Sequence, residues 1–70
     1  MPSTPEERIA AYRAAERAYH EATAAARREF MRKHPNGVTD RAAAAADIMT
    51  MRRAISDAQI ACERAMKGAA

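Results

Sequence analysis

The apolar residues in the second half of the chain repeat with the spacing of a helix that packs against another helix along its whole length. Successive steps between them alternate between four and three residues, which is an unbroken heptad pattern. The residues are Ala44, Ile48, Met51, Ile55, Ala58, Cys62 and Ala65. We therefore predict a helix over residues 40–67, with Gly68 just beyond its carboxyl end as a terminating glycine.

The first half of the chain predicts another amphipathic helix, over residues 5–33. Thr4-Pro5-Glu6-Glu7 has the sequence of a capping box, in which Thr4 and Glu7 bond each other's backbone N–H groups. No glycine or proline then occurs until Pro35. At 100° per residue one face of this helix is apolar and rich in alanine. That face carries Ala11, Tyr12, Ala15, Ala18, Tyr19, Ala22, Ala26 and Phe30.

Residues 34–38 predict a tight turn between the two helices. His34 precedes a proline, which disfavours helical backbone at His34. Asn36-Gly37 is a turn dipeptide that tolerates positive φ. Either Thr39 or Asp40 suits the N-cap of the helix that follows.

Two helices of nearly equal length and a short turn predict one all-α domain, residues 1–70, built as an antiparallel two-helix hairpin. Folding the chain about Asn36 places Ala26 near Ile48 and Tyr19 near Ile55. Most layers of this arrangement pair a large residue with a small one, as close antiparallel packing requires.

A hairpin of 70 residues with an alanine-rich seam buries little apolar area, and chains this short usually need a further source of stability. Cys62 is the only cysteine, so an internal disulfide cannot supply it. Self-association remains, most simply as a homodimer that forms a four-helix bundle. The candidates for its interface are the apolar residues outside the hairpin stripes: Ile9, Met31, Met49 and Ile60. The alternative is that they are isolated apolar side chains on an ordinary surface.

Nothing in the sequence predicts catalysis or cofactor binding. It has no nucleophile–base pair, no glycine-rich phosphate loop and no metal-ligand spacing. Glu16 and His20 lie one helical turn apart, which is typical of a solvated surface pair. Cys62 occupies a seam position, where cysteine behaves as a small apolar residue. We therefore expect a protein that is not an enzyme and binds no cofactor or metal.

Basic residues gather around the predicted turn and recur midway along the following helix. Such residues can contact phosphates or an acidic partner. The candidates are Arg27, Arg28, Arg32, Lys33, Arg41, Arg52 and Arg53. Acidic residues are interleaved with them, and the net charge is only +3, so a solvated charged face is the alternative interpretation.

Together these features predict a small helical interaction or assembly protein that acts through self-association and protein binding. The alternative is a nucleic-acid-binding accessory or regulatory protein that uses the basic residues near the turn. A third hypothesis is a subunit that orders fully only on a larger protein.

Composition adds expectations about origin and location. The chain has 20 alanines, and its 10 arginines far outnumber its 2 lysines, a bias typical of GC-rich genomes such as those of actinobacteria and their phages. No apolar run is long enough to span a membrane, and the first residues lack the pattern of a secretory signal. We expect no membrane partner and a cytoplasmic location, in a bacterium or in the host of a phage.

Overall fold

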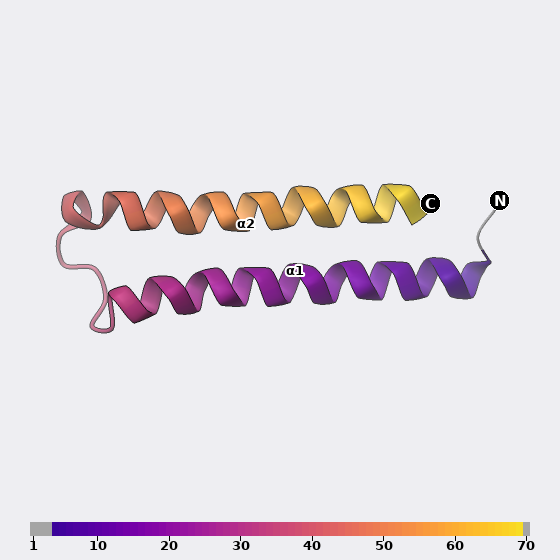
Figure 1. Cartoon of the computed structure of the whole chain (residues 1–70), viewed down its shortest axis with the longest axis horizontal. Helices are drawn as coiled ribbons and strands as arrows, with labels where there is room; N and C mark the ends of the chain where they lie inside the picture. Colours follow the sequence, from indigo (N-terminus) through magenta and orange to yellow (C-terminus); the bar gives the residue numbers. More distant parts are fainter. Residues whose placement is uncertain (1–3, 70) are drawn as a thin grey trace.

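The computed structural model describes residues 4–69, which form two long antiparallel helices joined by a loop (Figure 1). α1 spans Pro5–Lys33 and α2 spans Arg41–Ala69. The helices pack side by side, and the Cα atoms extend over 52 × 16 × 10 Å. The prediction of an all-helical hairpin is confirmed, whereas its dimerisation into a four-helix bundle stays a prediction.

α1 occupies the range predicted for it because local signals define both of its ends. Thr4 has extended backbone angles (φ −70°, ψ 158°), and its Oγ1 accepts a hydrogen bond from the backbone N–H of Glu7 at 3.1 Å. Pro5 lies in the first turn, where its missing N–H has no intrahelical partner to lose. At the other end the N–H of His34 donates to the carbonyl of Phe30 at 3.0 Å.

The connection between the helices is longer than predicted. The predicted helices leave residues 34–39 between them, with the turn at 34–38, whereas the observed connection covers residues 34–40 because α2 begins one residue later than expected. Gly37 has a positive φ of 83°, and its N–H donates to the carbonyl of His34 at 3.0 Å. This backbone conformation is open to glycine at little cost and reverses the chain within a few residues.

Asp40 caps α2. Its Oδ1 accepts hydrogen bonds from the backbone N–H groups of Ala42 and Ala43, at 3.1 and 3.3 Å. Of the two predicted candidates, Asp40 rather than Thr39 therefore satisfies the first donors of the helix.

The carboxyl end of α2 differs from the prediction. The helix continues through Gly68 to Ala69, so Gly68 is a helical residue and not a terminating one. Among the described glycines only Gly37 has a positive φ. A glycine inside a helix costs only about 1 kcal/mol relative to alanine, so its presence does not by itself end the helix.

The seam between the helices encloses very few side chains. Ala15, Thr23 and Ala44 are 6%, 3% and 2% exposed, and no large side chain in residues 4–69 is fully buried. Two helices share one contact line, so the larger seam residues each keep one side open to solvent. These half-buried residues are Tyr12, Tyr19 and Phe30 on α1, and Ile48, Met51, Ile55, Cys62 and Met66 on α2.

Three alanines that the predicted stripes placed in the seam are exposed: Ala18, Ala22 and Ala65. Thr23 is buried in place of Ala22, and Met66 is half-buried in place of Ala65. A straight α-helix has about 3.6 residues per turn, whereas a heptad pattern repeats every 3.5 residues. The predicted stripe therefore drifts around the helix, and after some turns the neighbouring residue faces the other helix in place of the predicted one. The Thr23 hydroxyl donates to the carbonyl of His20 at 3.2 Å, so its burial leaves that hydroxyl with a partner.

α2 lies further toward the loop than the predicted pairing requires. In Figure 1 the first turn of α2 extends beyond the last turn of α1. Ala26, predicted to lie near Ile48, lines a groove together with Met51 and Ala54, which follow Ile48 by about one and two helical turns.

Candidate interaction surfaces

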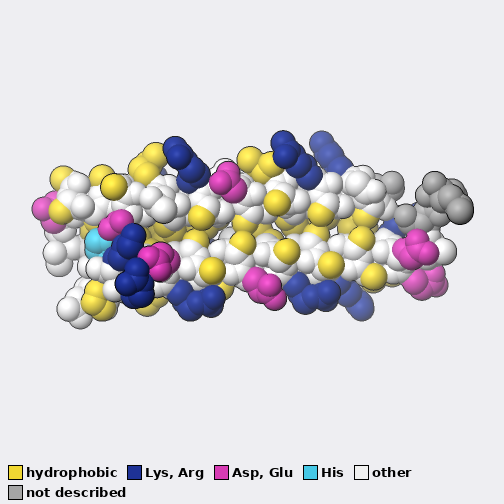
Figure 2. Space-filling view, viewed as in Figure 1, with side chains coloured by type: hydrophobic (Ala, Val, Ile, Leu, Met, Phe, Trp, Pro, Cys, Tyr) yellow, Lys and Arg dark blue, Asp and Glu magenta, His cyan; other side chains and the backbone are white. Residues whose placement is uncertain are grey.

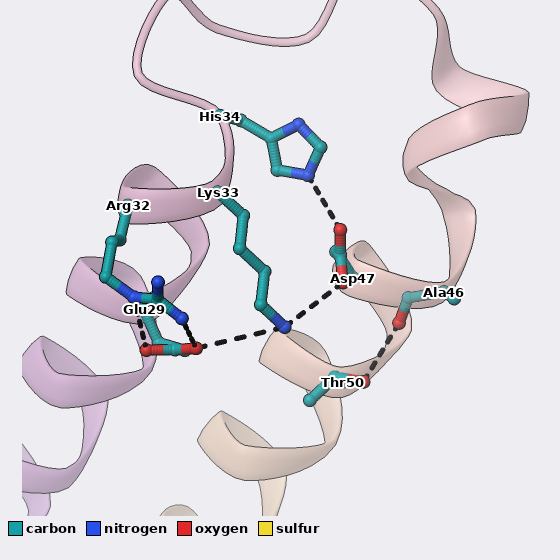
Figure 3. Close-up of polar contacts among 7 residues, drawn as sticks. All are labelled: Glu29, Arg32, Lys33, His34, Ala46, Asp47 and Thr50. Carbon is teal, nitrogen blue, oxygen red and sulfur yellow. Dashed lines mark hydrogen bonds and ion pairs between the residues drawn. The ribbon is translucent and has the colours of Figure 1, made fainter.

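A network of polar contacts joins the end of α1 to the second turn of α2 (Figure 3). We call it the loop-end network; it consists of Glu29, Arg32, Lys33, His34 and Asp47. Arg32 donates to both oxygens of Glu29, from Nε at 3.2 Å and from Nη2 at 2.6 Å. Lys33 Nζ lies between the carboxylates, 3.8 Å from Glu29 and 3.4 Å from Asp47. His34 Nε2 lies 2.9 Å from Asp47 Oδ2.

The loop-end network holds the pKa of both carboxyl groups below their ordinary values. The hydrogen bond with His34 is the largest cause of the lowered pKa of Asp47; partial burial opposes it and Lys33 adds to it. The hydrogen bond with Arg32 and the charge of Arg32 lower the pKa of Glu29, and the same contact raises the pKa of Arg32. Both carboxylates are therefore ionised near neutral pH, where they offset the charges of Arg32 and Lys33.

The other basic candidates are exposed and lie on different sides of the hairpin. Within the described range 4–69 no ion pair forms at Arg27, Arg28, Arg41, Arg52 or Arg53. At 100° per residue, Arg28 and Arg53 face outward from α1 and α2, away from the seam. Arg27, Arg41 and Arg52 fall on one flank of the seam, which we call the arginine side. The structure thus divides the seven predicted basic residues into three groups.

The four apolar residues predicted for an oligomer interface are exposed but do not form one patch. Ile9, Met31, Met49 and Ile60 are 49%, 64%, 59% and 44% exposed. Met49 and Ile60 share the outward side of α2, within about 20° of each other. Ile9 and Met31 lie near opposite ends of α1, about 33 Å apart at 1.5 Å per residue. The four residues are therefore spread along both helices.

Two apolar grooves run between the helices on the flank opposite the arginine side. The groove near the loop has a volume of about 140 Å³. It is lined by the apolar residues Ala26, Phe30, Met51 and Ala54 and by the polar residues Glu29, Lys33, Asp47 and Thr50. The other groove has a volume of about 230 Å³ and is walled by Tyr19, Cys62 and six alanines.

We call this flank the groove face; its central residues are Ala18, Ala22, Phe30, Met51, Ala54 and Ala61. Figure 2 shows it from the front. Hydrophobic side chains follow the line between the helices, whereas charged side chains lie along the two outer edges and at the loop end.

The groove face was not among the predicted surfaces, although the sequence contains a signal for it. Each helix carries a second run of mostly small residues at heptad-like spacings, about 90° around the helix from the seam. These are Ala11, Ala14, Ala18, Ala22 and Ala25 on α1, and Ala43, Thr50, Ala54, Ala61 and Ala65 on α2. Alanine contributes weakly to a hydrophobic pattern, so the stripe with larger residues was easier to recognise.

Other kinds of site find little support in the described chain. No group of three or more His, Cys, Asp or Glu residues that could hold a metal ion occurs within residues 4–69. Over the same residues, neither helix combines the length and the hydropathy needed to cross a membrane. No protein-family model matches the chain, and no curated protein or solved structure shows significant similarity to it. The surfaces described above are therefore the basis for a functional proposal.

Proposed function

We propose that this chain is a non-enzymatic interaction or assembly protein, which acts by associating with itself and by binding a protein partner. The observation that carries the proposal is the small enclosed interior, in which Ala15, Thr23 and Ala44 are the buried residues of the described chain. Burial this limited does little to offset the conformational entropy lost when two long helices are ordered. A second helical layer over the exposed apolar side chains supplies the missing burial.

The molar mass in solution over a dilution series tests this proposal. We expect sedimentation equilibrium to give a multiple of 7.7 kDa at high concentration, with dissociation on dilution. Circular dichroism should show helix content falling together with the mass, because folding and association are coupled. A chain that stays monomeric and fully helical at every concentration would contradict the proposal.

A second candidate function is the binding of nucleic acid through the arginine side. The observation that favours it is that Arg27, Arg41 and Arg52 are exposed, lie on one flank and form no ion pair within residues 4–69. Arginine side chains without carboxylate partners can contact successive phosphates of a nucleic-acid backbone.

An electrophoretic shift assay at two salt concentrations separates the two candidates. If the arginine side binds phosphates, the affinity should fall steeply with salt. The double variant Arg27→Gln/Arg52→Gln should then bind at least about tenfold more weakly. Arg28→Gln/Arg53→Gln removes the same charge from the outward surfaces and serves as the control. Absence of binding at low salt would eliminate this candidate.

A further inference from the structure

The isolated hairpin exposes more surface than a compact chain of its size. Its accessible surface is 5596 Å², whereas a compact folded monomer of 7.7 kDa exposes about 4300 Å². Its radius of gyration is 16.1 Å, compared with about 11 Å for a compact domain of this length. The excess area, about 1300 Å² per chain, is close to what one subunit buries in a stable homodimer.

We infer that the groove face is the surface on which a second copy of this chain docks. This inference rests on the proposed self-association and specifies where it occurs. It replaces the outward side of α2, with Met49 and Ile60, as the principal interface.

The position of the groove face around each helix is the first reason. In a four-helix bundle each helix contacts two neighbours in directions roughly 90° apart, and the larger side chains between those directions form the common core. The groove face lies about 90° from the hairpin seam on both helices. A layer placed on it covers the open sides of Tyr19, Phe30, Met51 and Cys62, which line the grooves. A layer on Met49 and Ile60 leaves those side chains open.

Side-chain size is the second reason. Ala18, Ala22, Ala54 and Ala61 line the grooves with single methyl groups. Helices that meet through such small residues can approach toward the lower end of the usual interaxial range of about 8–10 Å. Close approach compensates for the small apolar area of each alanine, because contacts are made with the backbone as well.

The charges along the edge of the groove face identify the occupant as a second copy. Consider two α1 helices that cross antiparallel, with Ala18 of one copy beside Ala22 of the other. Helical spacing then places Arg17 beside Glu21 of the other copy, and a twofold axis repeats this pair. The edge is therefore complementary in charge to itself, and its mixed signs do not suit a partner of uniform charge.

Matched charge insertions test which face associates. The double variant Ala22→Glu/Ala61→Glu places carboxylates at the centre of the groove face. Ala10→Glu/Ala46→Glu makes the same chemical change at exposed alanines outside both grooves. Met49→Asp/Ile60→Asp tests the outward side of α2. The dissociation constant of each variant is measured by sedimentation equilibrium and compared with that of the unmodified chain.

We expect the groove-face variant to raise the dissociation constant at least about 100-fold, because a dimer would bury unpaired carboxylates. The matched control should remain within a few-fold of the unmodified chain. If the unmodified chain dimerises and Met49→Asp/Ile60→Asp dissociates it while the groove-face variant does not, the inference is overturned and the proposed self-association stands. If the unmodified chain is monomeric throughout, both are overturned.

Thiol protection supplies a test that does not depend on a charged variant folding. In a Cys62→Ala background, Ala61→Cys places a thiol on the groove face and Ala46→Cys places one outside it. The rate of reaction with a thiol reagent should fall at least about tenfold for Ala61→Cys between dilute and concentrated protein. The rate for Ala46→Cys should stay constant. Equal behaviour of the two thiols would contradict docking on the groove face.

Discussion

Asp47 is the residue through which the two helices interact most directly by polar contacts. It lies on α2, yet both of its partners, Lys33 and His34, belong to the end of α1 and the start of the loop. These contacts hold α2 at its observed position along α1. The hydrogen bond between Asp47 and His34 therefore stabilises the register of the hairpin in addition to the packing of the helices. The ring of His34 also lies against Phe30, with centroids 4.7 Å apart.

The lowered pKa of Asp47 predicts a loss of stability in acid. In the unfolded chain the carboxyl titrates near its ordinary pKa of 3.8, and in the folded chain it titrates below that value. Its contribution is therefore complete above pH 3.8 and is lost as the pH falls through the lower, folded value. Thermal unfolding of Asp47→Asn should depend less on pH in this range than that of the unmodified chain.

Asp57→Asn is the matched control for this prediction, because Asp57 is exposed on α2 and has no part in the loop-end network. The two variants are compared by circular dichroism at neutral pH and at about pH 3. A steep acid dependence that persists in Asp47→Asn would show that the contact with His34 and Lys33 does not contribute.

At the scale of the helix, local interactions determine where each helix begins and ends. The sequence signals for these boundaries are clearer in α1 than in α2. α1 has a capping threonine, a proline in its first turn and a proline just beyond its end. α2 has a capping aspartate but no effective stop, since it continues through Gly68. The boundary of a helix is thus easiest to predict where a residue excludes helical backbone and hardest where a residue only weakens it.

The cap of α2 can be tested with a pair of neighbouring substitutions. Asp40→Ala should destabilise the chain by about 1 kcal/mol, because the N–H groups of Ala42 and Ala43 lose their acceptor. Thr39→Ala should change stability far less. Urea unfolding of both variants at one protein concentration measures the difference. If both variants lost the same stability, Thr39 and Asp40 would contribute equally to the cap.

The two glycines should respond oppositely to alanine. Gly68 has helical backbone, and a methyl group there would meet no atom within 4 Å, so Gly68→Ala should stabilise the chain by up to about 1 kcal/mol. Gly37 has φ of 83°, which alanine adopts at a cost, so Gly37→Ala should destabilise it by about 1 kcal/mol or more. Stabilisation by both substitutions would contradict the turn conformation.

At the scale of the whole molecule, the hairpin is long, thin and open on both flanks of its seam. One flank carries three arginines and the other carries two apolar grooves. Such a shape gives each helix one neighbour where a bundle gives it two. The stability of the chain should therefore depend on how much of it is associated.

The melting temperature should rise with protein concentration. For a dimer of this size we expect about 3–6 °C for each tenfold increase, because unfolding is coupled to dissociation. The groove-face variant Ala22→Glu/Ala61→Glu should lose this dependence, whereas Ala10→Glu/Ala46→Glu should keep it. A melting temperature that does not change with concentration would indicate that the hairpin is stable on its own.

The sequence alone determined the helical hairpin, the full extent of α1 and most of the seam. These follow from interactions between residues within a few positions of each other, such as Thr4 with Glu7, and from a heptad spacing that is visible without knowing the partner helix. The end of α2 escaped prediction because Gly68 permits helical backbone.

Only the tertiary structure decided how the exposed residues are grouped. The loop-end network and the existence of the groove face both depend on the rotation and register of α2 relative to α1. The rotation and the register result from many weak contacts between residues that are distant in sequence. They therefore cannot be predicted from the spacing of residues within one helix.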